Sequence, residues 1–183
     1  MTGSGAVSRF KAKLLRPAQP GAGGEWAFLV LPKTASNKLP RRGRTTVAGT
    51  LNGHPFQATL DPDGRLSHWM KVDEKLRKAA KVKAGDIVAL EVSPVEPEPE
   101  PRLPPDLKAA LAASPKARAT WKGTTTIARL DWVHWITTAK QQATRKRRIE
   151  NACHMLAAGK QRVCCVDPSG YYSKGFSAPE PAG

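Results

Sequence analysis

The sequence has few of the features on which secreted folds and membrane spans depend. Its 183 residues include 3 cysteines, of which Cys164 and Cys165 are adjacent. An odd count with an adjacent pair does not make a disulfide framework, so we expect a reducing compartment. No stretch approaches the roughly 20 apolar residues of a membrane span, and residues 1–7 lack the apolar region of a secretory signal. These absences predict a cytoplasmic protein.

The sequence also lacks the short motifs that identify common enzyme classes. Nucleophile elbows, P-loops, dinucleotide-binding glycine patterns and H-E-x-x-H zinc motifs are all missing. Cys153-His154 and Cys164-Cys165 do not have the spacing of a structural zinc site, and Cys153 falls on an apolar helix stripe. His54 and His68 have no nucleophile or carboxylate partner by motif. We therefore predict a non-enzymatic protein with no metal and no cofactor.

Acidic residues are scarce relative to basic ones. The chain has 15 Asp plus Glu against 30 Lys plus Arg, which gives a net charge of +15 and an isoelectric point near 10.2. Such an excess raises affinity for polyanions such as nucleic acid without specifying any of them. A basic surface with no anionic ligand is the alternative, and net charge alone leaves both open.

The most informative cluster is the run of cations from Arg145 to Arg148 near the start of a predicted helix. The helix macrodipole already makes that end positive, so these cations require compensation. Either a carboxylate elsewhere in the fold pairs with them, or an anion binds there. A second basic cluster lies on a predicted loop at 33–44. The candidate anion-binding residues are therefore Arg145, Arg147 and Arg148 on the helix, and Arg41, Arg42 and Arg44 on the loop. The alternative is that these arginines clamp neighbouring elements of the fold.

The first half of the chain has the pattern of a small β-barrel. Residues 9–15 alternate cations with apolar residues, and 25–31 form a short apolar run that is typical of a buried strand. Asn52-Gly53 favours a type I′ turn, so 45–51 and 55–60 should form a hairpin. Asp73 is placed to cap a short helix, and 87–92 reads as the last strand. We predict about six short strands over residues 9–93.

The second half has the pattern of a helical region. Residues 94–103 form an acidic proline linker, which should be extended and exposed. Residues 104–165 carry helix signals, including Pro115 at a first helical position. Trp132 and Trp135 lie three apart in an apolar stripe, which favours a place in the core over base stacking. Residues 166–183 are predicted to be a flexible tail. The fold class is therefore α+β, a barrel followed by a helical segment.

Both halves also resemble known families. Phe10-Lys11-Ala12, 26–32, 47–56 and 83–86 resemble a bacterial domain of unknown function with a double-split β-barrel. The second half is similar to the YdeI/OmpD-associated family, also called bacteriocin-protection proteins. That similarity rests on 132–136, Thr144-Arg145, Arg148-Ile149 and 156–160. The resemblance implies the fold and supplies no catalytic motif.

One departure from the second family bears on the arginine run. Members often carry Glu just before the Thr-Arg pair, whereas this chain has Ala143. An acid there would offset the cations of the first turn. Its absence favours an anionic partner or a pairing that another element supplies.

Two functions are compatible with these observations. The family resemblance and the missing catalytic motifs imply a non-enzymatic bacterial cytosolic binding or stress-protection protein with an anionic ligand. The alternative is a nucleic-acid-binding protein that uses the basic loop and helix, because the double-split barrel resembles the fold of small transition-state-regulator DNA-binding domains. A fold does not fix a function, so that likeness is an analogy. The sequence carries no signal for an oligomeric state.

Overall fold

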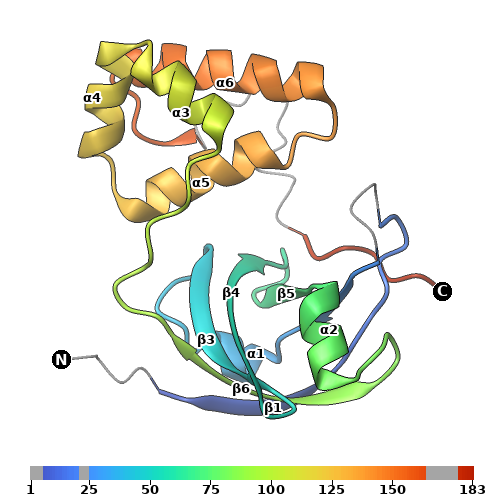
Figure 1. Ribbon diagram of the computed structural model, residues 1–183. Coiled ribbons are helices and arrows are strands. Elements are labelled where there is room, and N and C mark those ends of the chain that lie inside the picture. Colours follow the sequence, from blue (N-terminus) through green and yellow to red (C-terminus); the bar gives the residue numbers. More distant parts are fainter. Residues whose placement is uncertain (1–5, 21–24, 164–176) are drawn as a thin grey trace. The chain divides into compact units, whose positions relative to one another are not determined.

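The computed structural model describes residues 6–20, 25–163 and 177–183. They divide into two compact units (Figure 1). Unit 1 runs to Glu98 and also contains residues 177–183, whereas unit 2 begins at Pro99. Unit 1 holds all six strands and unit 2 holds four helices, which confirms the predicted α+β class.

Unit 1 is built on one curled antiparallel sheet, a half-barrel with the strand order β1-β6-β3-β4-β5-β2. The strands are β1 (Ser8–Lys13), β2 (Ala27–Val30), β3 (Thr45–Leu51), β4 (His54–Pro62), β5 (His68–Val72) and β6 (Ile87–Pro94). Beyond β1, the backbone of Leu15 bridges to Phe28 of β2, which joins the two ends of the strand order. The predicted six-stranded barrel is therefore confirmed.

Local interactions explain several of the connections between the strands of this sheet. Asn52 and Gly53 have φ angles of 49° and 84°, as a type I′ turn between β3 and β4 requires. The carboxylate of Asp73 accepts a hydrogen bond from the backbone N–H of Leu76 and starts α2 (Glu74–Ala80) as predicted. A one-turn helix, α1 (Lys33–Ser36), occupies part of the segment predicted to be a basic loop.

Apolar side chains from alternate strand positions fill the interior of unit 1. Leu29, Leu51, Leu60 and Val88 are among the residues that are completely or almost completely buried. β3 and β6 pass very close at Gly49, where a Cβ atom would lie 1.7 Å from a backbone carbonyl oxygen. A residue without a side chain is therefore required at that position.

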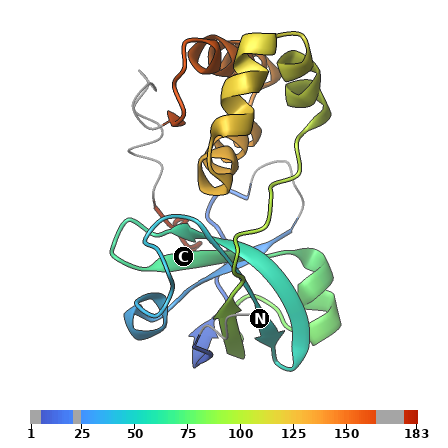
Figure 2. The same cartoon turned by 90° about the vertical axis from the view of Figure 1, so that its left-hand side faces the viewer.

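The described part of unit 2 contains four helices around a second core (Figure 2). They are α3 (Pro105–Ala112), α4 (Pro115–Gly123), α5 (Thr126–Thr137) and α6 (Gln142–Ala157). Trp132 and Trp135 of α5 are 0% and 3% exposed and meet edge to face with ring centroids 6.0 Å apart. The prediction that both tryptophans belong to the core is confirmed.

The acidic proline linker is not uniformly exposed, and the prediction is wrong for Glu98. The Glu98 side chain is 3% exposed and accepts hydrogen bonds from Arg41 at 2.9 Å and from the Thr46 backbone N–H at 3.1 Å. Glu96 also accepts from Arg41, whereas Glu100 accepts from Arg129 within unit 2. Arginine partners therefore hold all three glutamates, but only Glu98 is removed from solvent, since Glu96 and Glu100 remain exposed.

Residues 177–183 differ from the flexible tail that the sequence predicts. The backbone N–H of Ala18 donates to the Glu180 carbonyl at 2.7 Å, and the N–H of Ala182 donates to the Arg16 carbonyl at 2.7 Å. These residues therefore lie along unit 1 as an extended segment. The rest of the predicted tail, residues 166–176, lies outside the described residues, as do Cys164 and Cys165.

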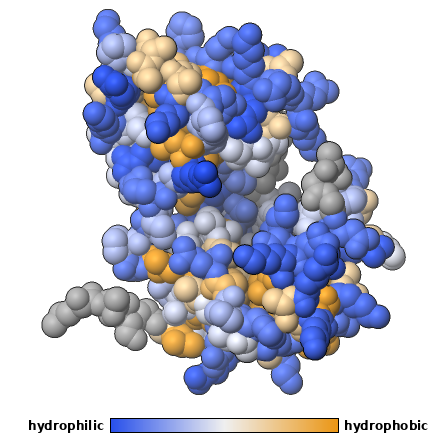
Figure 3. Space-filling model, viewed as in Figure 1, coloured by the Kyte–Doolittle hydropathy of each residue, from blue (hydrophilic) through white to orange (hydrophobic). Residues whose placement is uncertain are grey.

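The surface carries few large apolar side chains among the described residues. Val7, Leu66 and Ile87 are the exposed ones, and the face shown in Figure 3 is mostly hydrophilic with scattered apolar residues. None of the helices described has the length and hydropathy that crossing a bilayer demands.

Candidate functional site

Arg145 is paired with a carboxylate of a different helix. Its Nε and Nη2 atoms lie 2.6 and 3.0 Å from the two carboxylate oxygens of Asp106, in a bidentate arrangement. Asp106 belongs to the first turn of α3, and the guanidinium beside it lowers the pKa of that carboxyl below its ordinary value. The compensation that the start of α6 requires is therefore supplied, at this position, by Asp106.

The other two arginines of the helix run have different environments. Arg148 donates from Nη1 to the backbone carbonyl of Trp135 at 2.6 Å, and its guanidinium lies 5.4 Å from the centroid of that indole. Arg148 thus ties α6 to the last turns of α5. Arg147 is exposed beside Lys146, and the described part of the chain offers it no hydrogen bond or ion pair. In the run from Arg145 to Arg148, the first and last residues make contacts within unit 2, and the two between them are exposed.

The loop arginines are largely engaged with unit 1. Arg41 contacts Glu96 and Glu98 as described above, and the Nε of buried Arg44 lies 2.7 Å from a carboxylate oxygen of Asp61. Arg42 is exposed and makes longer contacts of 3.2 and 3.3 Å with a side-chain and a backbone oxygen. Arg41 and Arg44 therefore fix the loop to the sheet, and anion binding by these six arginines stays a prediction.

His68 has a partner that the sequence did not reveal. Its Nδ1 lies 2.7 Å from Ser36 Oγ, and its Nε2 lies 3.0 Å from the carbonyl oxygen of Gly43. A carbonyl only accepts, so Nε2 carries the proton and Nδ1 accepts from the serine hydroxyl. Burial lowers the pKa of His68 below its ordinary value. Both side chains are almost fully buried, so this pair holds α1 against β5 and offers no accessible nucleophile.

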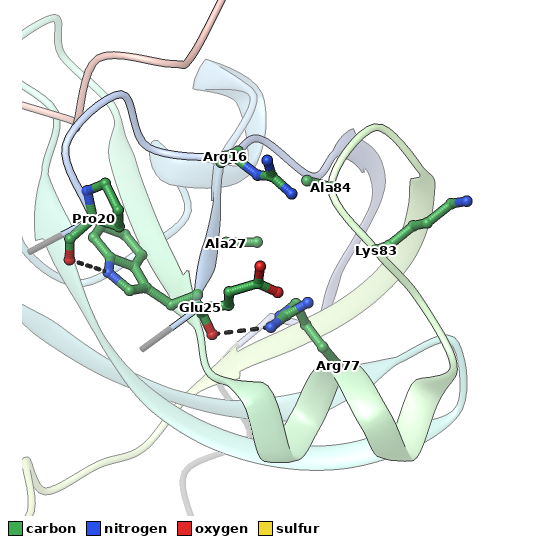
Figure 4. A pocket seen from close by; sticks show the side chains of 8 residues that line it. Arg16, Pro20, Glu25, Ala27, Arg77, Lys83 and Ala84 are labelled. Carbon is green, nitrogen blue, oxygen red and sulfur yellow. Dashed lines mark hydrogen bonds between the residues drawn. The ribbon is translucent and has the colours of Figure 1, made fainter. Parts of the chain in front are cut away.

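A cavity of about 420 Å³ in unit 1 brings together cations that no sequence pattern linked. Figure 4 shows Arg16, Glu25, Arg77 and Lys83 around it. Arg16 follows the bridge at Leu15, Arg77 lies on α2, and Lys83 lies on the turn before β6. Three separate segments contribute one cation each, so sequence reasoning missed the site.

The cations of this pocket are not neutralised by ion pairs within the described residues. Arg77 donates from Nη2 to the backbone carbonyl of Glu25 at 2.9 Å, while its buried Nε atom has no hydrogen-bond partner among the residues that the structure describes. Arg16 and Lys83 have exposed side chains. Three cations and the single carboxylate of Glu25 leave a formal charge of +2 on the lining. This contrasts with Arg41, Arg44 and Arg145, whose charges are matched by carboxylates.

An indole forms one wall of the pocket. Trp26 donates from Nε1 to the carbonyl oxygen of Pro20 at 2.9 Å, and the Nζ of Lys71 lies 4.8 Å from its ring centroid. Phe28 packs beside it with ring centroids 6.3 Å apart. The Trp26 ring therefore has a hydrogen bond, a cation–π contact and an aromatic contact that hold it in place. The pocket can bind an anionic group through its cations and an apolar portion against the indole.

Comparison with protein families finds one matching segment in each half of the chain. Residues 10–92 match the family described as Domain of unknown function (DUF1905), which covers the whole pocket lining. Residues 100–159 match the family described as Bacteriocin-protection, YdeI or OmpD-Associated, which covers Arg145 to Arg148. A search of curated proteins found no match. The two resemblances seen in the sequence are therefore confirmed.

Proposed function

We propose that this chain, which joins a DUF1905 domain to a YdeI/OmpD-associated domain, is a non-enzymatic stress-protection protein of the bacterial cytoplasm that binds a small anion in unit 1. One observation carries the proposal. The pocket gathers Arg16, Arg77 and Lys83 without ion-pair partners among the described residues. A phosphate or carboxylate group supplies the missing counter-charge.

The chemistry of the lining favours an oxyanion. Guanidinium groups bind phosphate and carboxylate through paired N–H donors, and Lys83 adds a compact positive charge. A buried donor with no acceptor, such as Nε of Arg77, costs about 1–3 kcal/mol, which a ligand oxygen within reach of it would offset. The +2 formal charge of the lining suits a monoanion or dianion.

Binding is favoured over catalysis because the pocket offers no activated nucleophile. Its lining residues are Arg16, Pro20, Glu25, Trp26, Ala27, Arg77, Lys83 and Ala84, among which no serine, cysteine or histidine occurs. The hydroxyl and imidazole of Ser36 and His68 are within hydrogen-bond distance but buried elsewhere in unit 1. A ligand in the pocket therefore meets charges and an indole, which hold it without reacting.

Nucleic-acid binding is the second candidate, and exposed cations favour it. Lys146 and Arg147 on α6 are exposed, and so is Arg42 on the loop. Phosphate contacts made by them would weaken steeply with salt, with a slope near −0.9 per contact on duplex DNA. Absence of gel retardation of single-stranded and duplex DNA at low salt would remove this candidate.

The test of anion binding uses inorganic phosphate, pyrophosphate and acetate with the full chain. Isothermal titration at low ionic strength should detect binding, and Arg16→Ala with Lys83→Ala should weaken phosphate affinity by about tenfold or more, equivalent to ~1.4 kcal/mol. Lys75→Ala removes one exposed charge from the same helix as Arg77, outside the pocket, and is the matched control. It should change affinity by less than about twofold, because the high dielectric constant of water weakens the interaction between the ligand and an exposed charge outside the pocket.

Two results would refute the proposal. One is that none of the three anions binds the full chain at low ionic strength. The other is that the Arg16→Ala, Lys83→Ala double variant binds phosphate as tightly as the unmodified chain.

A further inference from the structure

Residues 177–183 pair with residues 16–18 through one antiparallel β-bridge. The Ala18 N–H donates to the Glu180 carbonyl, the Ala182 N–H donates to the Arg16 carbonyl, and Pro17 bridges to Pro181. A further bond joins the Ala178 N–H to the Asp63 carbonyl at 3.3 Å. Figure 1 shows the red segment running beside the blue segment that follows β1.

The composition of the segment suits this mode of binding. Its sequence Ser-Ala-Pro-Glu-Pro-Ala-Gly places proline at 179 and 181, alternating with residues that keep a backbone N–H. Proline fixes φ near the extended range, so little conformational entropy is lost when the segment docks along an edge. The residues that bond with 16–18, namely Glu180 and Ala182, flank Pro181, whose missing N–H is not needed. Main-chain bonds provide the affinity, as in other cases of strand addition.

The edge that receives this segment carries part of the anion pocket. Arg16 accepts from Ala182 through its carbonyl while its side chain lines the cavity (Figure 4). On its other side, Leu15 is fixed by two backbone bonds to Phe28 of β2. Residue 16 therefore lies between two anchors, one in the sheet and one in the segment 177–183.

We propose that residues 177–183 act as an intramolecular strand that holds Arg16 in its place in the pocket, so that anion binding depends on the docking of this segment. This inference rests on the proposed function and adds its regulation. The backbone of residues 16–18 is thereby a binding surface for an extended segment in which proline alternates with other residues. In this chain the bound segment is residues 177–183. When the segment dissociates, the backbone next to Arg16 is held only by the Leu15–Phe28 pairing. The ligand must then order the Arg16 side chain as it binds.

The experiment compares the full chain with a variant that lacks 177–183. The first measurement is hydrogen exchange of the Ala18 amide, whose acceptor is the Glu180 carbonyl. We expect the deletion to speed that exchange and to weaken phosphate binding on the order of fivefold, because ordering of Arg16 is no longer provided in advance. A synthetic peptide of sequence 177–183 added in excess should restore both properties.

Two point variants separate docking from loss of charge. Ala182→Pro removes the N–H that Arg16 accepts and should weaken phosphate binding in the same direction as the deletion. Glu180→Ala removes an exposed carboxylate but keeps the backbone carbonyl to which Ala18 donates. It should leave the exchange of Ala18 unchanged.

The outcomes distinguish this inference from the function on which it rests. Unchanged exchange of Ala18 in the deletion variant overturns the docking, even when the full chain binds phosphate. Faster exchange with unaltered phosphate affinity overturns the coupling between segment and pocket. No phosphate binding by the full chain refutes the proposed function and the coupling with it, while Ala18 exchange still decides whether the segment docks.

Discussion

Replacement of Glu98 by alanine should destabilise unit 1 far more than replacement of its neighbour Glu96. The Glu98 carboxylate is 3% exposed and accepts from the N–H and the hydroxyl of Thr46 as well as from Arg41. The Glu96 carboxylate is 39% exposed and, within the described ranges, accepts from Arg41 alone. Both substitutions remove one negative charge from the same proline-rich stretch, so they form a matched pair.

The expected loss follows from the groups that Glu98→Ala leaves behind. A bond to a charged group contributes about 1.5–3 kcal/mol, and removal of one partner of a buried ion pair costs about 3–5 kcal/mol. Two features soften the loss: Thr46 Oγ1 also bonds to Thr59 Oγ1 at 2.9 Å, and Arg41 keeps Glu96. We therefore expect about 3 kcal/mol for Glu98→Ala, against roughly 0.5 kcal/mol for the more exposed Glu96→Ala.

Native-state hydrogen exchange of the strand amides is the appropriate measurement, because it reports on unit 1 separately from unit 2. The Thr46 amide, which donates to Glu98, should show the largest local change. A destabilisation by Glu98→Ala of less than about 1 kcal/mol, or one no larger than that of Glu96→Ala, would refute the reasoning.

Three further predictions rest on separate contacts. Gly49→Ala, with its Cβ 1.7 Å from a β6 carbonyl oxygen, should cost at least about 3 kcal/mol by denaturant unfolding, whereas Gly43→Ala, with open space, should stay within about 0.5 kcal/mol. Burial lowers the pKa of His68 in the folded protein, so the stability that His68 contributes is present above the unfolded pKa of about 6.5 and is lost as the pH falls below it. His68→Gln should therefore reduce the pH dependence of Tm between pH 7.5 and 5.5. Asp106→Asn should lower the free energy of unfolding by about 0.5 kcal/mol at pH 7 and low salt, and by less at high salt. The reason is that the Asp106 carboxylate is 38% exposed and its pKa is lowered by Arg145. Equal losses of stability at both salt concentrations would contradict this.

Elements that depend on local chemistry could be predicted from the sequence. Asn52-Gly53 specifies its turn by the positive φ of two adjacent residues, and Asp73 specifies the start of α2 by a carboxylate that bonds three residues ahead. Pro115 lies at the first position of α4 because its missing N–H is not needed there. Each signal acts within a few residues, so no knowledge of the tertiary fold is required.

Contacts between distant residues could not be predicted in the same way. Asp106 lies 39 residues before Arg145, and Glu98 lies 57 residues after Arg41, so no spacing rule connects them. The sequence left pairing and anion binding as alternatives, and the tertiary fold supplies the pairings. The pocket cations of unit 1 were missed for the same reason, because Arg16, Arg77 and Lys83 come from three segments that lie far apart in the sequence.

The pairing of the first strand with the last one also determines when unit 1 can complete its fold. Arg9 of β1 and Glu91 of β6 are 82 residues apart in the chain, yet their strands are neighbours in the sheet. During synthesis β1 emerges first and has no β6 to pair with until almost the whole of unit 1 has been made. Distant pairings of this kind slow folding, and an unpaired strand edge is open to association with other chains. Residues 9, 11 and 13 of β1 are cations, and charge repulsion between cationic strands opposes such association until β6 is available for pairing.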